Sequence, residues 1–198
     1  MDKATIDAYN LFAKEYEEET SAFWDRFPSV FLDTFAKLAK GRVLNVGSGP
    51  GRDGILLQER GLDVVCLDAS NAMVDLSSKK GLKLIVGDFN KLPFGDGEFN
   101  GVWAYTSLLH ISKQEVGISL LQIKRVLKPG GVLGLGLIEG DTEEYRQNSK
   151  VDAPRWFSYY SQLEIEDLLQ AHAFESVYFE TFKPGSRRYL NFIGKNTK

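Results

Sequence analysis

The sequence contains little of what metal-binding and disulfide-linked proteins need. Among 198 residues there are one cysteine, Cys66, and only two histidines. A single cysteine excludes an intramolecular disulfide, and two distant histidines with one thiol offer no metal-ligand spacing. We therefore expect no metal site and a reduced compartment. The Cys66 side chain should pack as a small apolar group in its strand-like run.

Long apolar runs and an excess of one charge are also absent. The 24 Lys and Arg residues face 27 Asp and Glu residues, the formal net charge is −3, and neither sign forms a long block. This balance disfavours a nucleic-acid partner. The first 20 residues are polar and acidic, and no segment has the length and apolarity of a signal peptide or a membrane span. We expect a soluble, cytoplasmic protein without a membrane partner. The oligomeric state has no signature in the sequence.

The length suits one α/β domain over residues 1–198, with a helical cap over 1–40 and a core over 41–198. In the cap, apolar residues at helical spacing predict one helix from Thr5 to about Glu19. A second helix should begin near Pro28 and end before Gly41, because proline is typical of the first turn and glycine follows helix ends.

Strands and helices then alternate along the core. The strands are expected at Arg42–Val46, Leu62–Leu67, Leu82–Val86, Phe99–Tyr105 and Val132–Ile138. Helices between them imply right-handed crossovers and a parallel sheet. Two last strands, Phe174–Phe182 and Arg188–Ile193, flank a Pro-Gly turn and predict an antiparallel hairpin at the sheet edge. The fold prediction is a three-layer α/β sandwich with a seven-stranded, mostly parallel sheet.

Three local patterns add expectations within this core. Ser112 with Glu115, and Ser161 with Glu164, have the spacing of capping boxes that begin helices. Residues 139–160 are rich in charge, arginine and aromatics and predict an irregular segment. Gly134 and Gly136 alternate with leucines, which indicates close approach of a neighbouring backbone or a ligand on one face of the strand.

A glycine-rich turn follows the first strand of the core. Gly47, Gly49 and Gly51 leave out side chains where the backbone bends and where a ligand would lie against N–H groups. Asp68 ends the second strand, and a carboxylate there can accept hydrogen bonds from both ribose hydroxyls. Asp88, after the third strand, can accept from an exocyclic amine. Their order fits an adenosine laid across adjacent strand ends, and the alternative is that both acids cap helices.

Five ordered motifs carry a resemblance to a known family. They are Val43-Leu44-Asn45-Val46-Gly47-Ser48-Gly49-Pro50-Gly51, Leu67-Asp68-Ala69-Ser70, Val86-Gly87-Asp88-Phe89, Leu92-Pro93-Phe94 with Phe99, and Val126-Leu127-Lys128-Pro129-Gly130-Gly131. Together they resemble class I S-adenosylmethionine-dependent methyltransferases of the small bacterial type, from about Arg42 to Gly140. The resemblance implies a Rossmann-like fold, S-adenosyl-L-methionine as cofactor, and methyl transfer to an unidentified, small-molecule acceptor.

The resemblance also assigns cofactor-binding residues. In the order of the chain they are Tyr16, Gly47, Ser48, Gly49, Gly51, Asp68, Ala69, Met73, Asp88, Phe89, Ala104, Tyr105 and Thr106. Asp68 would bind the ribose, Ala69 and Met73 would flank the adenine, and Tyr16 could close over the methionine carboxylate. The sequence departs from the family at Asn45, where Asp or Glu is usual, so a neutral amide replaces a carboxylate near the cationic end of the cofactor.

No residue is predicted to be catalytic. The methyl group of a sulfonium already has a good leaving group, so the enzyme mainly has to align the acceptor in a dry pocket. A general base is optional, and the candidates are His110, Tyr105 and Glu139; a histidine among leucines is more often a packed residue. The substrate wall is expected from Trp24, Phe27 and the segment from Tyr145 to Tyr160, where arginines among aromatics could hold a flat or anionic molecule or simply form the hem of a cap.

Two alternatives remain open at the level of sequence. Gly49-Pro50-Gly51-Arg52-Asp53-Gly54 satisfies the dinucleotide-binding pattern G-x-G-x-x-G with Asp68 near the expected distance, which would fit an NAD(P)-dependent oxidoreductase. Against it stand Gly47, Asp88 and the motif at Leu127, which a dinucleotide site does not require. The other alternative is a non-catalytic module that binds S-adenosylmethionine, for which Asn45 and the lack of an assured base are the only indications.

Overall fold

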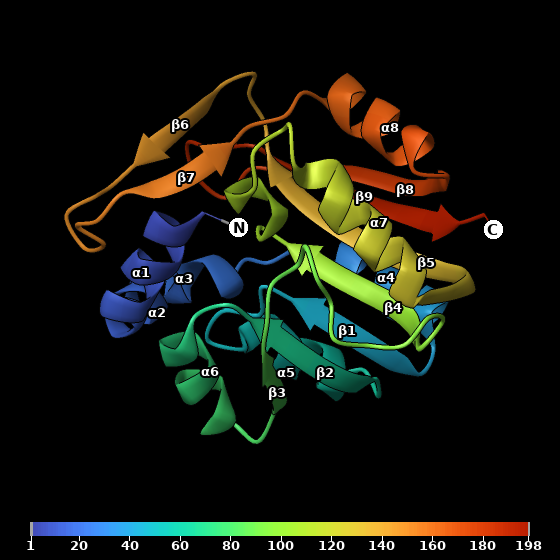
Figure 1. The fold of residues 1–198 in the computed structure, drawn as a ribbon, viewed down its shortest axis with the longest axis horizontal. Coiled ribbons are helices and arrows are strands. Elements are labelled where there is room, and N and C mark those ends of the chain that lie inside the picture. The colour runs from blue at the N-terminus through green and yellow to red at the C-terminus, as the bar shows by residue number, and fades with distance from the viewer. Residues whose placement is uncertain (1, 198) are drawn as a thin grey trace.

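A seven-stranded sheet forms the centre of the molecule in the computed structural model, which describes residues 2–197 (Figure 1). The strand order is β3-β2-β1-β4-β5-β9-β8. The strands are β1 Arg42–Val46, β2 Asp63–Asp68, β3 Lys83–Val86, β4 Phe99–Tyr105, β5 Leu127–Ile138, β8 Phe174–Phe182 and β9 Tyr189–Asn196. Strands β1 to β5 run parallel, whereas β9 pairs antiparallel with both β5 and β8. The predicted parallel sheet with an antiparallel terminal hairpin is confirmed.

The strand order reverses beside β1. The chain winds outward from β1 to β2 and β3, then returns to pair β4 with the other side of β1. Residue Val43 therefore lies between Val64 of β2 and Gly101 of β4. Ligands of open α/β sheets bind beyond the carboxyl ends of strands at such a reversal. The ends of β1, β2 and β4 are therefore the part of the fold to inspect for a site.

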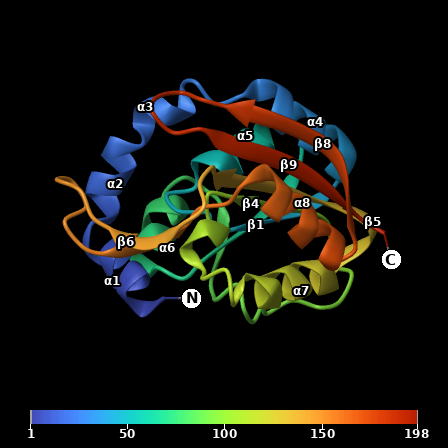
Figure 2. The same cartoon turned by 90° about the horizontal axis from the view of Figure 1, so that it is seen from above.

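Helices cover both faces of the sheet, giving three layers (Figure 2). One face carries α4 Ser29–Ala39 and α5 Arg52–Glu59, and the other carries α7 Val116–Val126 and α8 Gln162–Ala171. Helix α6 Asn71–Ser78 packs against β2 and β3. Each face encloses its own cluster of buried apolar side chains. Among residues 2–197, no helix is long and apolar enough to cross a membrane.

The N-terminal segment forms three short helices. They are α1 Lys3–Leu11, α2 Ala13–Glu19 and α3 Ser21–Trp24, so the prediction of one helix from Thr5 to Glu19 is wrong. Phe12 interrupts the helix with φ −116° and ψ 31°. In a continuous helix Tyr9 and Tyr16 would be separated by roughly 10 Å along the axis. The break instead brings their ring centroids to 5.0 Å, edge to face.

A second, separate hairpin lies over α1. Its strands are β6 Glu143–Arg146 and β7 Arg155–Ser158, so residues 139–160 are not irregular throughout, as the sequence suggested. The cross-strand pair Tyr145 and Trp156 stabilises it with ring centroids 5.0 Å apart. The Trp156 backbone N–H donates to Thr5 Oγ1 at 2.8 Å, which joins β7 to α1 (Figure 1).

One of the two predicted capping boxes is wrong. Helix α7 begins at Val116 and its N-cap is Glu115, which makes no side-chain capping bond. The carbonyl of Ser112 instead accepts from the backbone N–H groups of both Glu115 and Val116, so a separate turn precedes the helix. The other box, between Ser161 and Glu164, is confirmed at the start of α8. The 3-10 helix η1 Leu108–His110 follows β4.

Gly134 and Gly136 of β5 make room for aromatic rings. A Cβ on Gly134 would lie 2.6 Å from Cε3 of Trp103, and one on Gly136 would overlap the ring of Tyr105. Trp103 and Tyr105 belong to β4 and lie directly beside these glycines in the sheet. The close approach that the glycines indicated therefore comes from neighbouring side chains and not from a backbone or a ligand.

A buried polar group links β1, α5 and β4. Asp53, in the first turn of α5, accepts from Asn45 Nδ2 at 2.9 Å and from Trp103 Nε1 at 3.1 Å. Burial raises the pKa of Asp53 to about 6, although these hydrogen bonds and one from the Gly54 N–H act in the opposite direction. The group therefore positions the Trp103 ring at the cost of desolvating a carboxylate.

We expect Gly134→Ala to destabilise the fold by about 1–3 kcal/mol, because the new methyl group has to displace the buried Trp103 ring. Urea unfolding measures this change in the free energy of unfolding. The matched control is Gly185→Ala, where a Cβ would meet no atom within 4 Å and whose effect should stay within about 0.5 kcal/mol. Equal stability of the two variants would contradict the close packing described for β4 and β5.

Asp53 should make the stability of the fold depend on pH. Its pKa is about 6 in the folded chain, compared with the ordinary 3.8 of an unfolded chain. The favourable contribution of the protonated Asp53 to the free energy of unfolding is therefore fully present below pH 3.8 and is lost as the pH rises through about 6. The free energy of unfolding of the wild type, relative to Asp53→Asn, should therefore fall by about 1 kcal/mol between about pH 5 and pH 7.5. Urea titrations of both proteins measure this difference.

The exposed Asp63, at the start of β2, supplies the control. Lys83 holds the pKa of Asp63 below its usual value, so it is ionised in both states over that pH range. The difference between the wild type and Asp63→Asn should then be constant. A constant difference for Asp53→Asn as well would mean that the buried carboxyl group has an ordinary pKa.

Candidate functional site

Two adjoining cavities lie at the carboxyl ends of the central strands. The smaller, here called the turn cavity, has a volume of about 60 Å³ and is lined by Tyr9, Tyr16, Thr20, Trp24, Gly47–Pro50, Arg52, Asp53, Asp68, Met73, Phe89, Tyr105–Ser107 and His110. The larger, the arginine cavity, has a volume of about 350 Å³; its wall includes Arg26, Arg146, Arg155 and Arg187. Six residues line both: Tyr9, Tyr16, Thr20, Trp24, Thr106 and His110.

The glycine turn is shaped by crowding at one position and openness at another. Gly47 has φ +67°, and a Cβ there would overlap the side chain of Ser107 and lie 2.9 Å from Phe89 Cζ. Gly49 has φ +51°, and a Cβ there would meet no atom within 4 Å. Both need the left-handed conformation that glycine adopts without strain. The turn is thus tightly packed around Gly47, whereas at Gly49 it is open toward the turn cavity.

The N–H groups of this turn are directed into the protein. Those of Gly47 and Ser48 donate to the Leu67 carbonyl at 2.7 and 3.1 Å, and that of Gly51 donates to Ser48 at 2.9 Å. The Gly49 N–H donates to Asp68 Oδ2 at 2.8 Å. A dinucleotide site uses such N–H groups to hold a pyrophosphate. Here they are occupied, and the carboxylate of Asp53 lies in the first turn of α5, where a pyrophosphate would be repelled.

Asp68 joins the turn to the end of β2. Its Oδ2 accepts from Gly49, and its Oδ1 accepts from the Ser70 N–H at 2.9 Å. The side chain is 8% exposed, and burial raises its pKa despite these hydrogen bonds. Each carboxylate oxygen has a further lone pair, so the group can accept two more hydrogen bonds from a ligand in the turn cavity. The helix N-cap of α6 is Ser70 and not Asp68.

Unpaired polar atoms in the wall of the turn cavity indicate that it suits a polar ligand. The hydroxyl groups of Ser48 and Ser107 are buried without a hydrogen-bond partner among the described residues. Buried hydroxyls are normally paired, so a compound with donors and acceptors would satisfy them. The apolar side of the cavity consists of Met73 and Phe89, both about 2% exposed. A nucleoside with a polar amino-acid chain has this combination of polar and flat apolar groups.

The structure brings most of the predicted cofactor residues together. Tyr16, Gly47, Ser48, Gly49, Asp68, Met73, Phe89, Tyr105 and Thr106 line the turn cavity. Gly51, Ala69, Asp88 and Ala104 do not line it. Gly51 is the N-cap of α5, where a Cβ would lie 2.5 Å from Leu82 Cδ1. Glycine is therefore needed here for the packing of Leu82. Asp88 accepts from the Asn90 N–H at 2.9 Å in a turn after β3.

Asp53 is one of the wall residues that the sequence argument missed, as are Thr20, Arg52 and Ser107. Asn45 lacks the acidic group usual at its position, but its Nδ2 donates to Asp53, and Asp53 lines the turn cavity. A carboxylate is therefore present beside position 45, supplied by the next helix. The sequence signal for this role was Asp53 itself. It lies inside the glycine-rich motif, but it was considered only as a variable position of G-x-G-x-x-G.

The three candidate bases have different surroundings. Glu139 lines neither cavity and pairs with Arg188 at 3.1 Å. Burial raises the pKa of Tyr105 well above its usual value. Burial lowers the pKa of His110 to about 4. His110 Nδ1 lies 2.6 Å from the Trp156 carbonyl, which can only accept, so Nδ1 carries the proton and Nε2 accepts from the Tyr9 hydroxyl at 2.8 Å.

His110 therefore lies at the junction of three segments. Its two hydrogen bonds link η1 to β7 and α1, and its ring packs edge to face on Phe157 and Tyr9 with centroids 4.9 and 5.3 Å apart. A neutral imidazole with both nitrogens engaged acts as a fixed connector. This matches the expectation of a packed histidine more closely than that of a general base.

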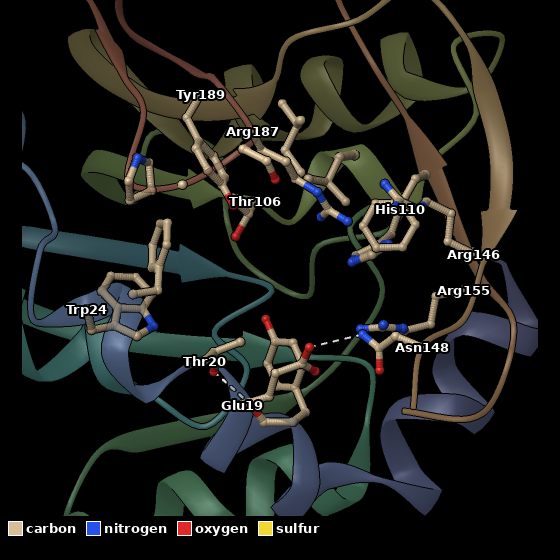
Figure 3. A pocket seen from close by; sticks show the side chains of 18 of the residues that line it. Glu19, Thr20, Trp24, Thr106, His110, Arg146, Asn148, Arg155, Arg187 and Tyr189 are labelled. Atoms are coloured by element: carbon tan, nitrogen blue, oxygen red, sulfur yellow. Dashed lines mark hydrogen bonds between the residues drawn. The ribbon is translucent and has the colours of Figure 1, made fainter. Parts of the chain in front are cut away.

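The arginine cavity overlaps only in part with the predicted substrate wall. Trp24, Arg146, Arg155 and Phe157 line it as expected, whereas Phe27, Tyr145, Trp156, Tyr159 and Tyr160 do not. The turn between β8 and β9 contributes Pro184–Arg187, which the sequence argument did not include. Figure 3 shows side chains from the N-terminal helices, the β6–β7 hairpin and the β8–β9 turn converging on this space.

Metal ligation has no candidate cluster in the part of the chain that the structure describes. Among residues 2–197, no three side chains of His, Cys, Asp or Glu lie close enough together to hold a metal ion. Cys66 is buried in β2, and burial raises the pKa of its thiol to about 12, so it has the character of a core side chain.

Comparison with known proteins finds methyltransferases among the relatives of this chain. Residues 43–131 match the family profile of the methyltransferase domain. A demethylmenaquinone methyltransferase from Beutenbergia cavernae is 35% identical over 142 residues, which are 67% of this chain and 58% of that protein. An uncharacterized methyltransferase from Staphylococcus carnosus is 23% identical over 198 residues, covering 96% of this chain and 90% of that protein.

The fold has solved counterparts as well. The 1,6-didemethyltoxoflavin-N1-methyltransferase of Burkholderia thailandensis, solved with 1,6-didemethyltoxoflavin and S-adenosylhomocysteine, has a TM-score of 0.74 at 21% identity. The alignment covers 98% of this chain and 89% of that chain, so the likeness includes the N-terminal helices and the terminal hairpin. These relatives support the sequence resemblance: the chain is similar to class I S-adenosylmethionine-dependent methyltransferases, and residues 43–131 match a methyltransferase domain.

Proposed function

We propose that this chain transfers a methyl group from S-adenosyl-L-methionine to a small molecule, with the cofactor in the turn cavity and the acceptor in the arginine cavity. The observation that carries this assignment is the wall shared by the two cavities, because two bound compounds would meet at Thr106 and Tyr16. Methyl transfer needs such a meeting point, since the acceptor atom must approach the methyl carbon directly. A cavity of about 350 Å³ suits a small molecule.

Specific side chains account for the parts of the cofactor. The Asp68 carboxylate would accept from the ribose hydroxyls, and Ser48 and Ser107 would pair their buried hydroxyl groups. The flat base would lie between Met73 and Phe89, which form the apolar side of the cavity. Gly49 leaves room for close approach of the methionine portion. Asp53 would supply negative charge near the cationic end, in place of the acid that position 45 lacks.

Entry of the cofactor requires movement of the N-terminal helices. A volume of about 60 Å³ holds only a few water molecules, and Tyr9 and Tyr16 close it from above. Helix α1 is held on α6 by Asn10 Oδ1, which accepts from Ser70 Oγ at 2.8 Å and from the Ala72 N–H at 3.2 Å. Opening would break these two hydrogen bonds together with those that join α1 to His110 and to Trp156, while the pairing of the sheet strands would stay unchanged. After closure the same tyrosines would exclude water.

The chemistry then depends on alignment. When bound, the cofactor would supply a methyl group on a sulfonium, which is already activated for transfer to a nucleophilic atom of the acceptor. The protein contributes a closed aromatic wall of Tyr9, Tyr16 and Trp24 that holds both compounds in place.

An oxidoreductase fits the geometry less well. The turn N–H groups that would hold a pyrophosphate are bonded within the chain, and Asp53 places a negative charge at the start of α5. A non-catalytic cofactor-binding module would not need the second cavity beside the first. Both observations favour methyl transfer.

The first test is calorimetric titration of the full chain with S-adenosylhomocysteine and with NAD. We expect binding of S-adenosylhomocysteine only, and we expect Asp68→Asn to weaken it about 10- to 100-fold, because an amide loses one charge-assisted acceptor. The matched control is Asp63→Asn at the other, exposed end of the same strand, which should leave the affinity unchanged. Binding of NAD alone would overturn the proposal, and equal affinities for both variants would overturn the role of Asp68.

A second test concerns His110. Because burial lowers its pKa to about 4, the ring should remain neutral from about pH 5 to pH 8, protonated at Nδ1. Two-dimensional ¹H–¹⁵N NMR of the imidazole rings measures this, and His172→Gln assigns the only other histidine. A titration of His110 near pH 6.5 would contradict the connector role and restore it as a candidate base.

A further inference from the structure

The arginine cavity carries a charge opposite to that of the whole chain. Four arginines line it, against a single acidic side chain, Glu19, whereas the chain has a formal net charge of −3. Glu19 accepts from Asn148 Nδ2 at 3.0 Å and so has a partner in the wall. His110 adds no charge because it is neutral at physiological pH. The positive charge is therefore concentrated where the proposed acceptor would bind.

Arg155, at the start of β7, is the clearest indication of an anion-binding site. Its side chain is only 5% exposed, and its Nε has no hydrogen-bond partner among the described residues. No carboxylate of residues 2–197 lies within ion-pairing distance of it. The guanidinium instead interacts with the Tyr9 hydroxyl and lies 5.6 Å from the ring centroids of Tyr9 and of Phe157. A buried guanidinium without a counter-charge is costly, so the site is built for a charge brought by a ligand.

Arg187 approaches the same place from the β8–β9 turn. Its guanidinium lies 5.9 Å from the centroid of Phe157, the ring that Arg155 also contacts, and it forms no ion pair with any residue from 2 to 197. Figure 3 shows Arg155 and Arg187 entering the cavity from different segments. The other two arginines are engaged: Arg26 donates to the Pro184 carbonyl at 2.6 Å, and Arg146 donates to the Tyr159 hydroxyl at 2.8 Å.

Aromatic side chains form a further large part of the wall. Phe23, Trp24, Phe157 and Tyr189 line the cavity together with Tyr9 and Tyr16. Such rings bind flat apolar groups, and a guanidinium binds a carboxylate or phosphate through two parallel hydrogen bonds. The volume of about 350 Å³ limits the ligand to a small molecule.

From these observations we propose that the arginine cavity binds a small, flat molecule that carries a carboxylate or a phosphate, with the oxyanion held by Arg155 and Arg187. The identification of this molecule as the methyl acceptor rests on the proposed function; the anion site itself does not. The oxyanion would lie toward Phe157, and the remainder of the molecule would extend along the aromatic wall toward Thr106, where the turn cavity begins.

The test uses the full chain, with and without saturating S-adenosylhomocysteine, and three probes of one size: benzoate, phenyl phosphate and the neutral benzamide. Calorimetry and saturation-transfer NMR measure their affinities. We expect at least one anion to bind about tenfold or more tightly than benzamide, and Arg155→Gln and Arg187→Gln each to remove about tenfold of that affinity while leaving that of benzamide unchanged. The two anions distinguish a carboxylate site from a phosphate site.

Arg188→Gln is the matched control, since this neighbour of Arg187 pairs with Glu139 and lines neither cavity. It should leave the affinity for both anions unchanged. Arg187 is only half-buried, so its variant keeps the test valid if Arg155→Gln does not fold. The proposal is overturned if benzamide binds as tightly as both anions, if neither anion binds at millimolar concentration, or if Arg188→Gln acts like Arg187→Gln.

The two proposals can fail separately. Each variant is also titrated with S-adenosylhomocysteine, which should bind to Arg155→Gln and Arg187→Gln as it does to the wild type. Loss of cofactor binding in the wild type would refute the methyltransferase mechanism, while the affinities for benzoate and phenyl phosphate would still decide the anion site. Selective binding of anions without any effect of either arginine would refute the site.

Discussion

The site depends on how closely the segments that follow β1, β3 and β4 approach one another at the carboxyl edge of the sheet. At Gly47 there is no space for a side chain, because Ser107 after β4 and Phe89 after β3 fill it. The parallel strands direct all three connections to one edge of the sheet, and the reversal of strand order places β4 directly beside β1. The glycine turn after β1 therefore has to leave the sheet on the side where Asp68 and the N-terminal helices lie. Both cavities lie on that side, and these helices line both of them.

The centre of the fold could be predicted because its pattern is local. Runs of buried apolar residues gave β1 and β4 their bounds, and glycines after the helices marked where the chain turns. The break at Phe12 could not be predicted, since the residue is neither glycine nor proline and its conformation is set by the packing of Tyr9 on Tyr16. The β6–β7 hairpin was missed for a similar reason, because it is stabilised by contacts with α1, far away in the sequence.

In the site, too, residues with a local sequence pattern were predicted, and residues whose role depends on distant contacts were not. Residues within the motifs, such as Gly49, Asp68 and Phe89, were found because each follows directly after a strand. Asp53 was missed because its role depends on contact with Asn45 and Trp103 in space. A position-by-position comparison with the family motif shows that Asn45 replaces an acid. It does not show that Asp53, in the next helix, places a carboxylate beside Asn45. Arg187 belongs to no motif, and only the return of β9 beside β5 brings it to the cavity.

The arginine cavity is closed by segments that lie far apart in the sequence. Its wall joins side chains from Tyr9 in α1 to Arg26 just after α3 with Pro184–Arg187 of the β8–β9 turn and Tyr189 of β9, whereas the glycine turn and Asp68 lie within one short continuous stretch of the sequence. Bringing segments so distant together requires closing a very long loop, which is entropically costly and slow compared with local βαβ assembly. Strands β1 to β5 can thus assemble before the second cavity, which is complete only once β9 has returned beside β5. Substitutions in the N-terminal helices and in the β8–β9 turn can alter which molecule is accepted while the βαβ core stays intact.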